Sequence, residues 1–340
     1  DEYADLMRLS VASAGNDHRL GANEAPPAIV SIFLGDELTK VLDSIENDTF
    51  FGKQQEIQME TGATVLPHFF KDNTDRNRTS PFAFTGNKFE FRMLGSSISV
   101  AGPNIVLNTA VAEALSQFYD ELKDTPQDKM DEAVHALVKR AILKHKKVIF
   151  NGNGYTDEWV EEAKKRGLYN FKSTPEVLPC FVADKNVKLF TKHHIYTESE
   201  INSRYEILLE NYCKTLHIEA KTLIDMVRRD FLPALMDYTD VIASSIERKS
   251  SVASLPCTAE RNLLTKLSGY YESITELTEK LIADTNEVEG YEDMQKAATF
   301  YHETILSDME AIREIADMAE EYIPDDMLPY PSYQQLLFYV

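Results

Sequence analysis

The sequence has few cysteines and no long apolar segment. Its three cysteines, Cys180, Cys213 and Cys257, lie far apart and show neither CxxC nor Cys/His metal spacing, which favours a reducing, cytoplasmic location. No apolar run approaches the ~20 residues that span a bilayer, and the first residues lack the basic-then-apolar pattern of a signal peptide. The sequence therefore predicts no membrane partner.

Basic residues are also scarce. Lys and Arg total 35 against 56 Asp and Glu, which gives a net charge of −21. Such a chain repels phosphate backbones and anionic membranes on average, so we expect no nucleic acid partner. Anionic ligands such as glutamate or a nucleotide would have to be bound by a few arginines concentrated locally. Individual arginines are therefore informative.

The composition is that of a packed globular protein. Hydrophobic residues make up 43% and charged residues 27% of the 340 residues, and this length suffices for two compact domains or for one large domain with a helical extension. The sequence starts DEYADLMRLS, without Met, and we expect a fragment that begins in mid-domain.

The two parts of the sequence differ in character. The first ~125 residues contain most of the Gly and Phe, in short segments separated by turns, as expected where loops and strands build a site. Pro26 and Pro27 suit the first turn of a helix that continues to Ile45. A second helix is predicted to start after Gly102-Pro103 and to end near Leu122.

From about Asp128 the sequence predicts long amphipathic helices, and the first has acidic residues early and lysines late, as the helix dipole prefers. Thr156 is a suitable cap for a helix that Gly167 closes, and Trp159 is expected in the core. Two later segments, joined by NEVEGYED, predict an antiparallel helical hairpin because their apolar residues recur at steps of three and four. The two seams are Leu264, Leu267, Tyr271, Ile274, Thr278 and Leu281, and Ala297, Tyr301, Ile305, Met309, Ile312, Ala316 and Ala319.

Two turn motifs contain candidate binding residues. In GNDHRLGANEAPP, Arg19 and Glu24 are held five residues apart by a turn, so a guanidinium fork and a carboxylate can face one ligand. In NRTSP, Arg78 precedes small hydroxyl residues in a second turn. On local pattern alone, the first motif could equally be a polar surface loop, and the second a turn with a solvated arginine.

A third motif, FTGNKFEFR, has the alternation of a strand. This alternation puts Lys88, Glu90 and Arg92 on one face, and Phe89 and Phe91 on the other face, against a core. A solvated amphipathic strand would show the same pattern, so periodicity leaves both interpretations open.

Longer strings contain these residues in a fixed order: GNDHRLGANEAPPAI, then NRTSPFAFTGNKFEFR, then LGSS and GPNIVLN. Together they resemble the glutamine synthetases, in particular the type III branch, from about Tyr3 to Leu115, and the closing LPYPSYQQLLFYV is similar to that branch's terminus. The resemblance implies an α+β fold. Residues 1–127 would be the C-terminal portion of the catalytic domain, with antiparallel strands and helices, and residues 128–340 a helical C-terminal region ending in a short tail.

The resemblance also implies a reaction, the ATP-dependent ligation of ammonia to glutamate through a γ-glutamyl phosphate. Arg19 would bind the carboxylate of the substrate glutamate. Glu24 would be the flap residue that shields the acyl phosphate and helps to form the ammonium site. Arg78 would meet the nucleotide phosphates, and Arg92 would lie near the transferred phosphate and the substrate.

The remaining expectations come from the same resemblance. Glu90 would bind Mg²⁺ or Mn²⁺, and Lys88 lies near a nucleotide-binding position that is often Arg in related branches. A second arginine, expected five residues after Arg78, is replaced by Ala83, which puts one phosphate contact in doubt. Because the family forms stacked rings with shared active sites, a homo-oligomer, such as a dodecamer, is implied.

Other patterns are interpreted as structural. His193 and His194 lack metal-ligand spacing, and the glycine-rich segment from Asn151 to Gly154 lacks the P-loop lysine, so it is predicted to be a linker. The helical second half leaves an alternative open. The chain could be a non-catalytic helical module for assembly or interaction, derived from the same family.

Overall fold

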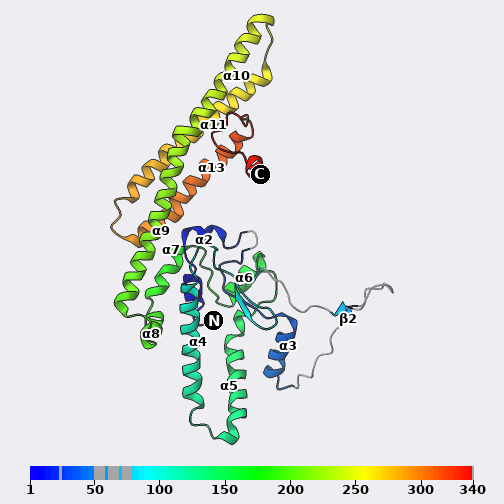
Figure 1. Ribbon diagram of the computed structural model, residues 1–340, viewed down its shortest axis with the longest axis vertical. Coiled ribbons are helices and arrows are strands. Elements are labelled where there is room, and N and C mark those ends of the chain that lie inside the picture. Colours follow the sequence, from blue (N-terminus) through cyan, green and yellow to red (C-terminus); the bar gives the residue numbers. More distant parts are fainter. Residues whose placement is uncertain (23–24, 50–57, 60–68, 71–78, 339–340) are drawn as a thin grey trace. The chain divides into compact units, whose positions relative to one another are not determined.

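The computed structural model describes residues 1–22, 25–49, 58–59, 69–70 and 79–338 (Figure 1). The chain divides into two compact units, Asp1–Tyr205 and Glu206–Val340. Helices predominate in both units, and the described strands lie in the first. The expected mixture of helices with a small amount of sheet is therefore confirmed.

The principal sheet of the first unit has three short strands, β1 (Ile32–Phe33), β4 (Phe82–Phe84) and β5 (Phe89–Phe91), in the order β1-β4-β5. β4 pairs with β5 antiparallel but with β1 parallel, so the expectation of antiparallel strands was wrong for one pair. The chain between β1 and β4 is long enough for the crossover that a parallel pair requires. A separate antiparallel pair joins β2 (Gln58–Met59) to β3 (Phe69–Phe70).

The β4–β5 hairpin shows the alternation that the sequence predicted, with one correction. Phe82 lies opposite Phe91, and Phe84 lies opposite Phe89, with ring centroids 5.6 Å and 5.2 Å apart. Phe89 is nevertheless 47% exposed. These rings therefore pack mainly on one another across the strands, rather than against the buried core that we expected.

Short and medium helices surround this sheet, and Figure 1 shows α4 and α5 running beside each other. The α-helices of the first unit are α1 (Ala4–Leu9), α2 (Ala14–Arg19), α3 (Gly35–Glu46), α4 (Ala101–Leu122), α5 (Met130–His145), α6 (Asp157–Lys165), α7 (Thr174–Val177) and α8 (Asp184–Lys192). Three 3₁₀ turns accompany them: η1 (Gln127–Lys129), η2 (Lys146–Val148) and η3 (Leu178–Val182). The helix predicted to end near Leu122 is confirmed as α4.

The helix predicted from Pro26 was wrong in nearly its first half, because α3 begins only at Gly35. The residues ahead of α3 are not helical, and Ile32 among them pairs with Phe82 in the sheet. Gly35 then adopts a φ of +74°, a left-handed conformation that suits glycine, and α3 follows from there. Sheet pairing thus takes precedence over the helical spacing of the apolar residues.

The core beside α6 forms as the sequence predicted. Trp159 is 1% exposed and packs with Ile29 and Ala163, while the ring of Phe150 stacks on it at a centroid distance of 3.7 Å. The Thr156 hydroxyl accepts a hydrogen bond from the Trp159 amide, which confirms the predicted cap.

The regular elements described in the second unit are all helices. α9 (Glu198–Met226) spans the boundary between the units. The elements that follow are the π-helical turn η4 (Val227–Phe231), α10 (Leu232–Ala253), α11 (Thr258–Val288), α12 (Met294–Phe300), the π-helical turn η5 (Tyr301–Ile305), α13 (Leu306–Glu320) and α14 (Tyr333–Phe338). No helix in the described ranges is long and apolar enough to cross a membrane.

α11 and α13 pack against each other in opposite directions. Lys280 of α11 pairs with Asp308, and Lys266, further back along α11, donates to the Tyr322 hydroxyl beyond α13. The turn η5 explains the residue spacing on this side, where Ala297, Tyr301 and Ile305 are buried at successive steps of four. A π turn has more residues than an α turn, so it keeps such positions on one face.

Candidate functional site

The first and third motifs meet in the structure through Arg19. This residue ends α2, and its Nη1 donates to the Met93 carbonyl at 3.0 Å, while its Nη2 donates to the Arg92 carbonyl at 3.2 Å. The guanidinium is thus oriented by backbone oxygens just after β5. Two segments that are more than seventy residues apart in sequence are joined here.

Asn16 supports this arrangement, although no spacing in the sequence singled it out. It is 3% exposed, and its Nδ2 donates to the carbonyls of Val11 and Met93 at 2.8 and 3.0 Å. Its Oδ1 accepts from Arg19 at 3.3 Å. Since Asn16 lies one helical turn before Arg19, the turn between them is fixed to the end of β5.

A row of charges lies on one face of β5 and its flanks. The Nη2 of Arg92 donates to Glu90 Oε2 at 2.9 Å, and Lys88 Nζ lies 3.5 Å from the other carboxylate oxygen. The hydrogen bond from Arg92 lowers the pKa of Glu90, so this carboxyl is ionised at neutral pH. The Arg92 side chain is 22% exposed, whereas that of Lys88 is 65% exposed.

These placements cover four of the six predicted site residues. The side chains of Lys88, Glu90 and Arg92 form one row, and the Arg19 guanidinium contacts the backbone of Arg92. Glu24 and Arg78 lie outside the described residues. The roles of all six remain predictions.

Ala83 lies opposite Glu90 in the hairpin and is fully buried. The family resemblance of the motifs predicted an arginine at this position. The surroundings of Ala83 are closely packed, so a long side chain at this position would need its neighbours to move. The alanine fits this space.

Glu90 is the one predicted metal ligand, and it has the oxygen chemistry that Mg²⁺ and Mn²⁺ prefer. Among the described residues, no group of three or more His, Cys, Asp and Glu side chains is placed to hold a metal ion. Glu90 could therefore supply one ligand, and the others would come from outside the described part of the chain.

An ion pair anchors α2 from its other side. Arg8 and Asp17 are almost fully buried and lie 2.9 Å apart, and Asp17 also accepts hydrogen bonds from the amide and the hydroxyl of Thr174. Burial raises the pKa of Asp17 although Arg8 acts in the opposite direction. Nothing in the local sequence indicates this pair, because its remaining partners, Phe171 and Lys172, lie more than 160 residues from Arg8.

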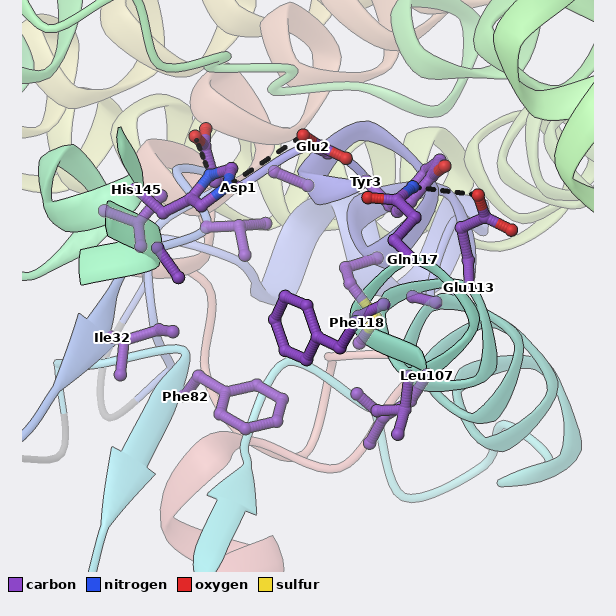
Figure 2. Close-up of a pocket in the computed structure, with 18 residues that line it drawn as sticks. Asp1, Glu2, Tyr3, Ile32, Phe82, Leu107, Glu113, Gln117, Phe118 and His145 are labelled. Carbon is purple, nitrogen blue, oxygen red and sulfur yellow. Dashed lines mark hydrogen bonds and ion pairs between the residues drawn. The ribbon is translucent and has the colours of Figure 1, made fainter. Parts of the chain in front are cut away.

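A cavity of the first unit lies elsewhere. It has a volume of about 360 Å³ and is bordered by α1, α4, α5 and the sheet. Figure 2 shows Phe82 and Phe118 facing this space, with Glu113 and Gln117 at one end. Because Phe82 and Ala83 are adjacent on β4, the cavity and the charged row lie on opposite faces of the sheet.

The fold and the charged row define a class of protein, an α+β chain whose sheet presents paired arginine and glutamate side chains suited to anionic ligands and cations. A family model described as "Glutamine synthetase C-terminal domain" matches residues 133–250. A glutamine synthetase of Butyrivibrio fibrisolvens is 46% identical over 99% of this chain, and the type-3 glutamine synthetase of Dictyostelium discoideum is 40% identical over 99%. A glutamine synthetase of Bacteroides fragilis (strain YCH46) is 36% identical over 98%.

The chain is therefore similar to glutamine synthetases over nearly its whole length, and the resemblance seen in the motifs is confirmed. It covers 48%, 47% and 47% of these three proteins, so the chain spans about half the length of the curated relatives it matches.

Proposed function

We propose that this chain contributes part of an active site that joins ammonia to the γ-carboxylate of glutamate with ATP, by way of a γ-glutamyl phosphate. The observation that supports this most directly is the contact between the first and third motifs, in which Arg19 donates to the carbonyls of Arg92 and Met93. It places the guanidinium of Arg19, from the first motif, against the backbone of Arg92, from the third. The homology to glutamine synthetases supplies the reaction.

In this proposal the arginines bind and orient anions. Arg19 holds the carboxylate of glutamate, and Arg92 lies near the phosphoryl group during transfer. Phosphoryl transfer spreads negative charge over peripheral oxygens, and positioned guanidiniums stabilise that charge without covalent chemistry. Glu90 pairs with Arg92 and keeps its guanidinium oriented. Glu24 would shield the acyl phosphate, and Arg78 would contact the nucleotide.

Mg²⁺ or Mn²⁺ is part of the same proposal, with Glu90 as one ligand; a bound divalent ion would neutralise phosphate charge. We further propose that residues 1–127 are the C-terminal portion of the catalytic domain, and that residues 128–340, with the α11–α13 pair, form a helical region. A cytoplasmic homo-oligomer of stacked rings, such as a dodecamer, completes the proposal.

The function is tested with Arg92→Ala in the complete enzyme. Loss of a charge-assisted contact of about 3 kcal/mol should lower glutamine formation on the order of a hundredfold or more. Arg229→Ala is the matched control, because Arg229 is an exposed arginine of the second unit that pairs only locally with Asp225. Near-normal glutamine formation by Arg92→Ala would refute the role of this residue.

A further inference from the structure

The cavity of the first unit has a mainly apolar wall. Its volume is about 360 Å³, and Figure 2 shows Ile32, Phe82, Leu107 and Phe118 around the space. Ile32 and Phe82 come from paired strands, whereas Leu107 and Phe118 come from α4. No side chain of the described residues fills the space. The apolar groups around it therefore lack packing partners that a protein interior normally supplies.

The apolar surface extends beyond the cavity along α4. Four residues at steps of four, three and four border the cavity and therefore lie along one face of the helix: Leu107, Val111, Ala114 and Phe118. Val111 is 48% exposed, and Leu115 on the same side is 61% exposed. At a rise of 1.5 Å per residue, the face from Leu107 to Phe118 is about 16 Å long.

Helix α5, which lies beside α4, continues this surface. Ala141 and His145 border the cavity. Val134 and Val138 lie seven and three residues before Ala141, on the same face of the helix, and both are exposed. Apolar side chains that are exposed together on two neighbouring helices are typical of a surface that another protein segment covers.

The carboxylates at the edge of the cavity already have cationic partners. The pairs are Glu113 with Lys192 at 2.7 Å, Glu2 with Lys144 at 2.7 Å, and Asp1 with Lys147 at 3.1 Å. These carboxylates are therefore neutralised by neighbouring side chains and do not favour a cationic ligand. The surface selects an apolar occupant.

We propose that the part of the complete protein that lies outside this chain covers the apolar surface of α4 and α5 and inserts an apolar side chain into the cavity. The chain spans 48%, 47% and 47% of three relatives, so about half of each such protein lies outside the matched region. This is enough chain to cover both helices.

Two other occupants fit the surface less well. A small molecule could fill the cavity but would leave most of the face of about 16 Å beside it uncovered. A second copy of this chain would bring another net charge of −21 to the contact, and the two copies would repel each other. A segment of the same complete protein meets neither objection.

The test compares Ala114→Cys in this chain alone and in the complete protein. Ala114 borders the cavity, whereas Ala112 on the same helix is exposed and is not among the residues that border it, so Ala112→Cys is the matched control. Labelling with iodoacetamide is followed by mass spectrometry of the peptide that contains each site, which separates it from the native cysteines. We expect Ala114→Cys to react at least tenfold more slowly in the complete protein than in the chain alone. Ala112→Cys should react at similar rates in both.

Three outcomes would overturn the inference. Equal rates for Ala114→Cys in the two proteins would show that the cavity stays open. Equal protection at both positions would show a cover that does not enter the cavity. Protection that appears in the chain alone as its concentration rises would assign the surface to a second copy.

A second pair of variants tests whether the space is filled. Ala114→Phe adds a ring where the cavity has room, so the thermal midpoint of the chain alone should stay the same or rise. In the complete protein the ring would meet the inserted side chain, and the midpoint should fall by about 3 °C or more. Ala112→Phe should change neither midpoint. Equal tolerance of Ala114→Phe in both proteins, or a lower midpoint in the chain alone, would contradict the inference.

This inference does not depend on the proposed function. The cavity and the charged row lie on opposite faces of the sheet, and neither measurement requires ATP or glutamate. If the complete protein forms no glutamine, the proposed function fails, and labelling still decides whether the cavity is occupied. If a protein that forms glutamine shows no protection at Ala114→Cys, only the present inference fails.

Discussion

Glu113 of α4 is a buried carboxylate surrounded by donors from two helices. Gln117 Nε2 lies 2.8 Å from it, Lys192 Nζ lies 2.7 Å from Oε2, and His193 Nε2 is at the same distance from that oxygen. Two hydrogen bonds, the larger effect coming from Lys192 and the next from Gln117, lower the pKa of Glu113 to about 2. The carboxylate therefore holds the end of α8 against α4.

This contact predicts a loss of stability in acid. The pKa of Glu113 is lower in the folded state than its ordinary value of 4.5, so its contribution is complete above that value and is lost as the pH falls toward 2. Between pH 5 and pH 3 the free energy of unfolding should decrease by about 2 kcal/mol through this group. Urea titrations at both pH values should show a smaller decrease in Glu113→Gln, and an unchanged decrease would contradict the prediction.

Single residues also show how far the sequence alone could lead to the site. Arg19, Glu90 and Arg92 could be chosen as site residues because they lie in motifs that resemble those of a known family and occur in the same order. Asn16 and Glu113 could not, since their importance lies in partners from distant segments that no local pattern indicates. Long-range hydrogen bonds depend on tertiary packing, which spacing along a chain does not encode.

Among the elements, helices with strong local determinants were predictable and those in competition with the sheet were not. α4 ends where expected but begins at Ala101, just before the Gly-Pro pair, whereas α6 has both expected ends because a Thr cap and a closing glycine act locally. The start of α3 was misplaced because Ile32 gains a strand partner fifty residues later. Pairing of this kind overrides helical spacing.

The cap of α6 permits a quantitative test at the level of an element. Thr156→Ala removes the acceptor of the Trp159 amide and should lower the free energy of unfolding by about 1 kcal/mol. Thr156→Ser keeps a hydroxyl and is the control. Denaturation followed by tryptophan fluorescence measures both variants, and equal stability of Thr156→Ala and Thr156→Ser would contradict the capping role.

For the whole molecule, the division into two compact units predicts separable unfolding. Trp159 is the single tryptophan of the chain and lies in the first unit, so its fluorescence reports on that unit. Ile274 is fully buried in α11 of the second unit, and Ile274→Ala should lower the stability of that unit by about 2–5 kcal/mol.

The measurement compares two probes in one titration. Circular dichroism at helical wavelengths should show an earlier transition in Ile274→Ala, because much of the helix content lies in the second unit. The Trp159 fluorescence transition should keep its midpoint, as expected for domains with their own cores. A shift of both transitions by the same amount would show instead that the chain unfolds as one cooperative body.

The π turn η5 has a consequence for insertions and deletions. Such a turn contains one residue more than a regular helix would use, and Glu303 within it is exposed. Deleting Glu303 should convert the turn to ordinary helix and leave Ile312 and Ala316 facing α11. The same deletion further along α13, at Glu314, would rotate every following side chain by about 100° and expose Ala316 and Ala319. Homologous chains can therefore differ in length by one residue at η5, whereas a one-residue change within α13 would disrupt the packing.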